Sequence, residues 1–314
     1  MSLRFIKPGL QTSLQDSGRS GFMHHGIGAG GVMDSDSASL ANWLVGNPAN
    51  AAVLEITLIG PVIEFLSPMT IAVCGAEFVL SLNEFPIENG ESIEVEKGDI
   101  LTFGHRESGS RAYLAFSAEP DVEKCFDSFS TQLSAGFGGF KGRAFQANEE
   151  LALKKIRQTK TRRLPRSLVA NYLGKYLFRC CPAVETEKFE TSVLQKFQQS
   201  AYQVSADSNR MGVRLIGEPI DYQAIGEIIS GGLTQGSIQL PSSGLPIISS
   251  VDGQTIGGYP RIANIISADL PLLGQLRAND RVRFQIVTLE KAVNFLRQKQ
   301  AYYNRLLAGK LTAH

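Results

Sequence analysis

The chain has 314 residues, of which 43% are hydrophobic and 19% are charged. This balance is typical of globular proteins and excludes a largely disordered chain, and the length suits two domains. The formal charge is +1, from 31 basic and 30 acidic residues, which disfavours nucleic acid as a partner. The N-terminal residues contain no signal-peptide core and no stretch is apolar enough to span a membrane, so we expect a cytoplasmic protein.

The 31 glycines and 13 prolines of the chain indicate many turns, which favours a β-rich fold with short strands. One helix is expected over residues 34–45, with Asp34 as its N-cap and Gly46 as its stop. Runs rich in β-branched and aromatic residues then predict strands at residues 53–57, 62–65, 70–73 and 112–116.

A basic stretch separates the two halves of the chain. Between Lys154 and Arg166, seven residues are basic and none is acidic. Such a run repels itself and stays solvated, so we expect residues 153–168 to link a domain at 1–152 to a domain at 169–314. A docking site for an acidic partner surface is the alternative interpretation of the same charges.

The second half predicts more strands and two helices. The motif at residues 58–65, LIGPVIEF, is echoed at residues 215–222 as LIGEPIDY, which favours two similarly built domains. Because the strands do not alternate regularly with helices, the sequence predicts a mainly β fold with a few short helices rather than a doubly wound sheet. The expected strands lie at 237–240 and 281–287, and the expected helices at 185–198 and 288–307.

Two glycine-containing segments near the N-terminus hold the first candidate site residues. In residues 15–22, QDSGRSGF, the glycines allow a sharp turn that presents Arg19 to a carboxylate, with Asp16 orienting the guanidinium. The alternative is a β-turn whose aspartate caps its own backbone. The loop at 26–34 lacks the Lys-Ser/Thr ending of a P-loop, but its glycines allow a ligand to approach the backbone closely.

A region rich in hydroxyls and glycines follows at residues 128–143. Hydroxyls, unhindered amides and cations together are typical of a site for phosphate or carboxylate. A lysine occupies the third glycine position of a GxGxxG pattern, so the region is not a dinucleotide fingerprint. A glycine-rich hairpin with surface charges is the competing interpretation. The candidate contacts are Ser130, Thr131, Gly138, Gly139, Lys141 and Arg143.

Two polar segments in the second half supply further candidates. Arg210 and Arg214 flank a glycine, and a later segment combines Asp252, Gln254 and Tyr259 with hinge glycines. A small polar ligand needs such a mixture of donors and acceptors in a cleft. Purely structural loops use the same residue types, so both interpretations stay open.

Histidines and cysteines give no pattern for a metal site. His24 and His25 would face opposite sides of a strand, which argues against shared metal ligation. His25 is a candidate acid or base, or else a structural histidine. The four cysteines have neither redox nor zinc spacing, so we expect free thiols, and no Met-Lys pair is present for biotin attachment.

Several long motifs, in order along the chain, resemble the KipA-like family, also called allophanate hydrolase subunit 2. They are TSLQDSGRSGF, GVMDSDSASLANWLVGN, LEITLIGP, SRAYLAF, STQLSAGFGGFKGRAF, SNRMGVRLIG and DGQTIGGYPRIA. The resemblance implies two cyclophilin-like β-barrel domains. Stand-alone members resemble the C subunit of ATP-dependent 5-oxoprolinase, which works with a KipI-like B subunit and a LamB/YcsF-like A subunit.

The resemblance implies that the chain helps to open 5-oxoproline to L-glutamate, with ATP used by the complex. An arginine suits the substrate carboxylate, and a carboxylate or imidazole suits proton transfer. The expected roles are proton transfer by Asp16, His25 and Asp252, carboxylate binding by Arg19, Arg210 and Arg214, and orientation of the lactam by Gln254 and Tyr259.

Two other functions are compatible with the same family. One is a biotin-dependent carboxyltransferase acting on urea or a similar amide, with biotin carried by a separate partner. The other is a KipA-like regulator that binds and antagonises a KipI-like kinase inhibitor.

Overall fold

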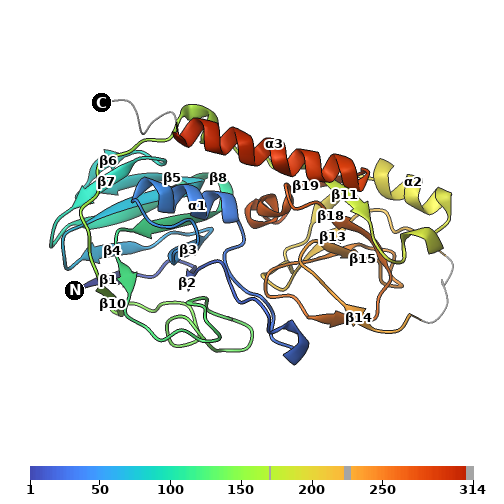
Figure 1. Ribbon diagram of the computed structural model, residues 1–314, viewed down its shortest axis with the longest axis horizontal. Coiled ribbons are helices and arrows are strands. Elements are labelled where there is room, and N and C mark those ends of the chain that lie inside the picture. Colours follow the sequence, from blue (N-terminus) through green and yellow to red (C-terminus); the bar gives the residue numbers. More distant parts are fainter. Residues whose placement is uncertain (170, 223–227, 309–314) are drawn as a thin grey trace. The chain divides into compact units, whose positions relative to one another are not determined.

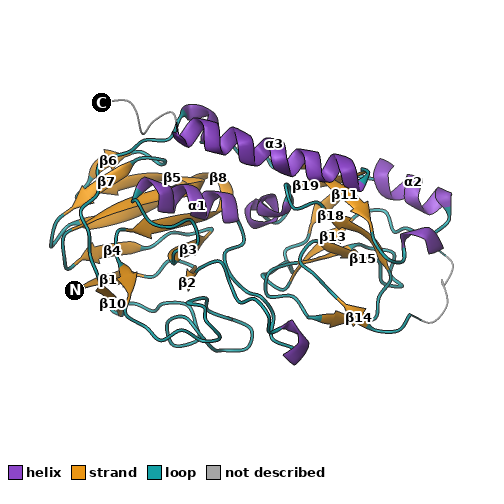
Figure 2. Ribbon diagram, in the orientation of Figure 1, coloured by secondary structure: helices purple, strands orange, loops and turns teal. Residues whose placement is uncertain are grey.

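The structure is a computed structural model that describes residues 1–169, 171–222 and 228–308 (Figure 1). The chain divides into two compact units. The first contains Met1–Phe22 and Ala29–Leu173, and the second contains Met23–Gly28 and the residues from Gly174 onward. Strands dominate both units and helices are few, so the predicted mainly β fold is confirmed (Figure 2).

The basic stretch at 153–168 runs along the first unit. The backbone amides of Arg157 and Leu164 donate to carbonyls of this unit at 2.9 and 2.8 Å. The guanidinium carbon of Arg162 lies 5.1 Å from the ring centroid of Trp43. Carbonyl and aromatic contacts therefore offset part of the repulsion that led us to expect a solvated linker. Domains with boundaries at 152 and 168 stay a prediction.

The first unit is built on a ten-stranded antiparallel sheet. Its strand order is β2-β3-β8-β4-β1-β10-β9, and β5 also pairs with β6, β7 and β8. The long strands β5 and β8 contain the expected short strands at 70–73 and 112–116. The strands are β1 Ser2–Lys7, β2 Gln11–Gln15, β3 Val53–Thr57, β4 Val62–Phe65, β5 Met69–Leu82, β6 Phe85–Ile87, β7 Ser92–Val95, β8 Ile100–Phe116, β9 Glu119–Pro120 and β10 Glu150–Lys154.

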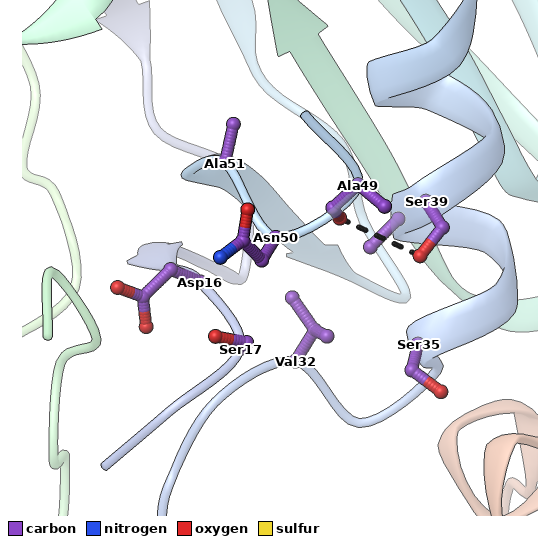
Figure 3. Close-up of a pocket in the computed structure, with 9 residues that line it drawn as sticks. Asp16, Ser17, Val32, Ser35, Ser39, Ala49, Asn50 and Ala51 are labelled. Carbon is purple, nitrogen blue, oxygen red and sulfur yellow. Dashed lines mark hydrogen bonds between the residues drawn. The ribbon is translucent and has the colours of Figure 1, made fainter. Parts of the chain in front are cut away.

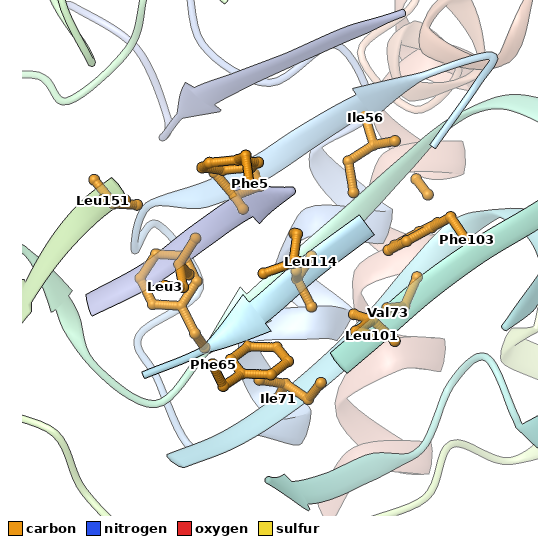
Figure 4. Close-up of a cluster of buried hydrophobic side chains, with 14 of the residues drawn as sticks. Leu3, Phe5, Ile56, Phe65, Ile71, Val73, Leu101, Phe103, Leu114 and Leu151 are labelled. Carbon is orange, nitrogen blue, oxygen red and sulfur yellow. The ribbon is translucent and has the colours of Figure 1, made fainter. Parts of the chain in front are cut away.

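Alternating side chains of this sheet form the first core (Figure 4). In β1, Leu3 and Phe5 are fully buried while their neighbours are partly exposed, as a strand with one buried face requires. Helix α1, Ser35–Leu44, begins where predicted, because the Asp34 carboxylate accepts the amides of Asp36 and Ser37 at 3.1 and 3.0 Å. The helix ends before Gly46, whose φ is +72°.

The second unit contains a closed β-barrel with the order β11-β18-β15-β16-β13-β12-β19. Strands β14 and β17 form a separate two-stranded sheet. The strands are β11 Lys175–Pro182, β12 Tyr202–Val204, β13 Gly212–Ile216, β14 Gly231–Gly232, β15 Ser237–Gln239, β16 Ile247–Ser249, β17 Ile256–Gly257, β18 Arg261–Ile265 and β19 Arg281–Ile286, and the α-helices are α2 Thr191–Gln199 and α3 Leu289–Ala308.

Four short 3₁₀ helices complete the described elements. They are Met23–His25, Arg166–Leu168, Thr186–Lys188 and Leu270–Gln275. The helix expected at 185–198 is wrong over its first part, because the chain is extended at Phe189 and Glu190 before α2 begins. Phe189 is 5% exposed and belongs to the second core, so its burial outweighs local helical preference. Within the described residues, no helix combines the length and apolar character needed to cross a membrane.

The barrel core gives a test of the second unit. Phe284 is 2% exposed, and its ring stacks on Phe197 with centroids 4.6 Å apart. We expect Phe284→Ala to lower the free energy of unfolding by about 3–5 kcal/mol, measured by urea denaturation. Phe85→Ala is the matched control, because Phe85 is 75% exposed and its loss should cost less than about 1 kcal/mol. Equal losses in the two variants would contradict the assigned core.

Candidate functional site

Asp16 lies directly after β2 and is the centre of a buried polar cluster. Its Oδ1 atom accepts the hydroxyls of Ser128 and Ser130, both at 2.6 Å, and the amide of Gly18 at 2.8 Å. Its Oδ2 atom accepts the amide of Phe129 at 2.7 Å. The carboxylate therefore ties the loop at 128–130 to the end of β2.

The same loop also pairs with the backbone of β2. The amide of Thr131 donates to the carbonyl of Leu14 at 2.9 Å, and the amide of Asp16 donates to the Ser130 hydroxyl at 3.0 Å. Four protein hydrogen bonds to one carboxylate favour an anchoring role for Asp16. The predicted proton-transfer role stays a prediction.

Arg19 lies next to this loop and is 4% exposed. Its Nε donates to the carbonyl of Cys125 at 3.2 Å, its Nη2 donates to the carbonyl of Ser130, and its guanidinium carbon lies 4.9 Å from the Phe137 ring centroid. A buried cation in this position suits recognition of an anionic group.

Two of the predicted glycines are required by close packing in this cluster. A Cβ on Gly138 would lie 2.4 Å from Nη2 of Arg19, and a Cβ on Gly139 would lie 1.9 Å from Oγ1 of Thr131. Both glycines also have positive φ, +70° and +54°. The structure therefore brings together six of the predicted site residues, namely Asp16, Arg19, Ser130, Thr131, Gly138 and Gly139.

The other two residues of the predicted cofactor site share one carboxylate. Lys141 and Arg143 form ion pairs with Glu149 at 2.9 and 2.6 Å. The hydrogen bond from Arg143 is the main reason that the pKa of Glu149 falls to about 2. Glu149 therefore offsets charge that the sequence analysis assigned to a ligand, and cofactor binding by these residues stays a prediction.

A pocket of about 160 Å³ lies beside Asp16 in the first unit (Figure 3). It is bounded by the end of β2, the start of α1 and the segment that precedes β3. The lining residues are Asp16, Ser17, Val32, Ser35, Ala38, Ser39, Ala49, Asn50 and Ala51. Asp16 and the glycine-rich loop at 26–34 were predicted as site residues, whereas Ser39 and Asn50 were not.

Buried polar groups hold one wall of the pocket. Glu55, which is 1% exposed, accepts the amide of Met33 at 2.8 Å and the hydroxyl of Tyr113 at 3.0 Å. The Tyr113 oxygen in turn accepts the amide of Asp34 at 2.8 Å, and burial raises the pKa of Tyr113 well above its usual value. The sequence contained one signal for this network, because Glu55 is an acidic residue within the mainly apolar strand at 53–57.

In the second unit, Arg210 and Asp252 form a buried ion pair with each other. Nε and Nη2 of Arg210 lie 2.8 and 3.0 Å from the two carboxylate oxygens of Asp252. The two side chains are 5% and 0% exposed. Arg214, Gln254 and Tyr259 are at least partly exposed in this unit. The structure therefore gives Arg210 and Asp252 a geometry that orders the loops at 210 and 252, and their roles toward substrate stay predictions.

His25 ends the first 3₁₀ helix, and its ring centroid lies 3.9 Å from that of His24. Both residues are exposed, and the role of His25 in proton transfer stays a prediction. No group of three metal-ligating side chains occurs in the part of the chain that the structure describes. All four cysteines are free thiols, as predicted, and burial raises the pKa of Cys74 and Cys180.

The fold and these motifs define a carboxyltransferase domain. The chain belongs to the family of carboxyltransferase domains with subdomains A and B, whose family model matches residues 25–286. The family membership predicted from the motifs is confirmed at this level.

Full-length relatives carry a more specific name. The chain is similar to the C subunit of 5-oxoprolinase from Escherichia coli, with 36% identity over 97% of each chain. It is 31% identical to the C subunit of 5-oxoprolinase from Haemophilus influenzae over 94% of each chain. Its structure is similar to that of urea amidolyase from Kluyveromyces lactis, with a TM-score of 0.91 and 28% identity over 97% of this chain, but it spans only 20% of that protein.

The Asp16 cluster predicts a specific loss on substitution. In Asp16→Asn, an NH₂ donor replaces an acceptor oxygen that faces hydroxyl and amide donors. We expect the free energy of unfolding to fall by about 2–3 kcal/mol and amide exchange at Phe129 and Ser130 to quicken, measured by urea denaturation and hydrogen exchange. Asp121→Asn, at an exposed ion pair with Lys154, should cost less than about 1 kcal/mol. The anchoring role is wrong if the two variants are equally stable.

Glu149 predicts an acid-sensitive contribution to stability. Because its folded-state pKa is about 2, below its usual value of 4.5, the contribution is present above pH 4.5 and is lost as the pH falls toward 2. Glu149→Gln cannot titrate, so its unfolding free energy should fall less over this range than that of the wild type. Thermal unfolding at several pH values measures the difference, with the exposed Glu84→Gln as control. Identical pH profiles for Glu149→Gln and the wild type would show that the Arg143 pair contributes nothing.

Proposed function

We propose that this chain is the C subunit of an ATP-dependent 5-oxoprolinase, an enzyme complex that opens 5-oxoproline to L-glutamate. One observation carries the proposal. The chain matches the C subunit of the E. coli 5-oxoprolinase over 97% of both lengths, whereas it spans only a fifth of the K. lactis urea amidolyase. A match over both whole lengths favours the activity named for that relative over the activity of a protein of which only a fifth is matched.

The other subunits of the complex would supply the coupling to ATP. A lactam without ring strain resists hydrolysis near neutral pH, so coupling to ATP provides the driving force. The sequence has no P-loop, and the partners we propose are a KipI-like B subunit and a LamB/YcsF-like A subunit in the cytoplasm. Titration of each purified subunit with ATP identifies the one that binds the nucleotide.

Within this chain, the first-unit cluster supports binding of an anionic substrate. Arg19 supplies a buried guanidinium, and Asp16 holds the adjoining loop in place through four hydrogen bonds. We assign Arg19 to the substrate carboxylate and Asp16 to positioning. The further roles proposed from the sequence are proton transfer by His25 and Asp252, and substrate contacts by Ser130, Thr131, Arg210, Arg214, Gln254 and Tyr259.

A second candidate function is a biotin-dependent carboxyltransferase subunit acting on urea or a similar amide. The observation that favours it is the family itself, together with the TM-score of 0.91 to urea amidolyase. The biotin would come from a separate partner protein. Sensitivity of the reconstituted activity to avidin separates this function from the first, because a 5-oxoprolinase without biotin is unaffected.

Reconstitution tests the first proposal directly. Purified A, B and C subunits are mixed with 5-oxoproline and ATP, and glutamate is measured with and without this chain. We expect omission to reduce ATP-dependent glutamate formation at least tenfold, and stoichiometric addition of the chain to restore it. If omission leaves the rate unchanged, this chain is not a required subunit.

A further inference from the structure

The volume of the pocket beside Asp16 limits what it can enclose. The cavity volume is about 160 Å³. Pockets that enclose drug-sized ligands are larger, about 300–1,000 Å³. The pocket therefore does not fit a nucleotide or a whole biotin, and it suits one small molecule or one functional group.

The lining combines an apolar floor with an uncharged polar rim. Val32, Ala38 and Ala51 provide the apolar surface, and the rim contains hydroxyls and the amide of Asn50. Figure 3 shows Asn50, Ser17 and Asp16 at one end of the pocket, with Ser39 and Ser35 at the other. Among the described residues, no cation lines this pocket, and the carboxylate of Asp16 points away from the other lining residues, toward the loop at 128–130.

These features disfavour an anionic group and favour an amide. A ligand carboxylate would find no neutralising cation in the lining, which is costly in a partly enclosed site. A neutral amide has both N–H and C=O groups. The serine hydroxyls and the Asn50 amide of the rim can donate to the C=O group and can accept from the N–H group. The apolar floor suits the methylene groups of a small ring.

The wall that carries Asn50 is held in place without a ligand. Asn42 is fully buried, and its Nδ2 donates to the carbonyl of Ala51 at 2.8 Å. The hydroxyl of Ser39 lies 3.5 Å from the carbonyl of Ala49. These contacts join α1 to the segment before β3, so the pocket is preformed, as small-ligand sites usually are.

We propose that this pocket binds the uncharged amide or lactam group of a small substrate and leaves any substrate carboxylate outside the pocket. The identification of that lactam as 5-oxoproline rests on the proposed function. The amide class rests only on the volume and lining of the pocket.

Ligand titrations on the purified chain, followed by ligand-observed NMR, test the proposal. The probes are 2-pyrrolidinone as a neutral lactam, 5-oxoproline, urea and acetate. We expect saturable binding of the two lactams and none of acetate at the same concentrations. Failure of both lactams to bind the wild-type chain, or equal binding of acetate, would overturn the proposal.

Two variants locate the binding. Ser39 is half-buried in α1, so Ser39→Leu fills the pocket with a good helix former and should weaken lactam binding at least tenfold. Ser192→Leu, at an exposed position in α2, is the matched control and should bind as the wild type. If Ser39→Leu fails to fold, Asn50→Ala at the exposed rim serves instead, with an expected loss of about two- to tenfold. Unchanged lactam binding in the folded pocket variant refutes the site.

The binding assay needs neither the other subunits nor ATP, so it separates this proposal from the proposed function. Lactam binding that Ser39→Leu removes would stand even if omission of the chain left glutamate formation unchanged. Absence of lactam binding would remove the pocket assignment while a requirement for the subunit could still hold.

Discussion

The buried carboxylate of Asp16 is the interaction on which the first-unit site depends. A buried charge is tolerated only when its hydrogen-bonding capacity is met, and here two hydroxyls and two amides meet it. Those donors come from both sides of Asp16, at Gly18 and at residues 128–130. One side chain therefore fixes two loops that are more than 100 residues apart in sequence, and the same residue lies at one end of the pocket between β2 and α1.

Close packing is the second constraint on the residues around Asp16 and Arg19. The guanidinium of Arg19 lies against Phe137, and the chain at Gly138 and Gly139 passes so close that any Cβ would overlap Arg19 or Thr131. Glycine at these positions is therefore explained by packing and by positive φ, without any ligand. A glycine-rich segment that looks suited to phosphate can owe its composition to the side chains that it covers.

Local patterns predicted the elements better than the site. The β-branched run of β3 and the Asp34 cap of α1 are visible in short stretches of sequence, because each depends on neighbouring residues. The pairs Arg210–Asp252 and Glu55–Tyr113 join residues that are distant in sequence. No local pattern shows that the two side chains of each pair bind each other. The short helix predicted at 185–198 failed for a related reason, because burial of Phe189 in the barrel core is a tertiary effect.

The relatives place the pocket in a chemical context. Their names refer to two small substrates, 5-oxoproline and urea, and these molecules share an N–C=O group but differ in ring and charge. In our proposal, the small pocket with hydroxyl and amide groups at its rim recognises the shared group, because that group needs only neutral donors and acceptors. Discrimination between a charged lactam and urea would then require a cation elsewhere, and Arg19, which we propose for this role, lies in the same unit without lining the pocket. The proposal therefore makes recognition of the amide and recognition of the carboxylate separable, because different residues of the first unit carry them.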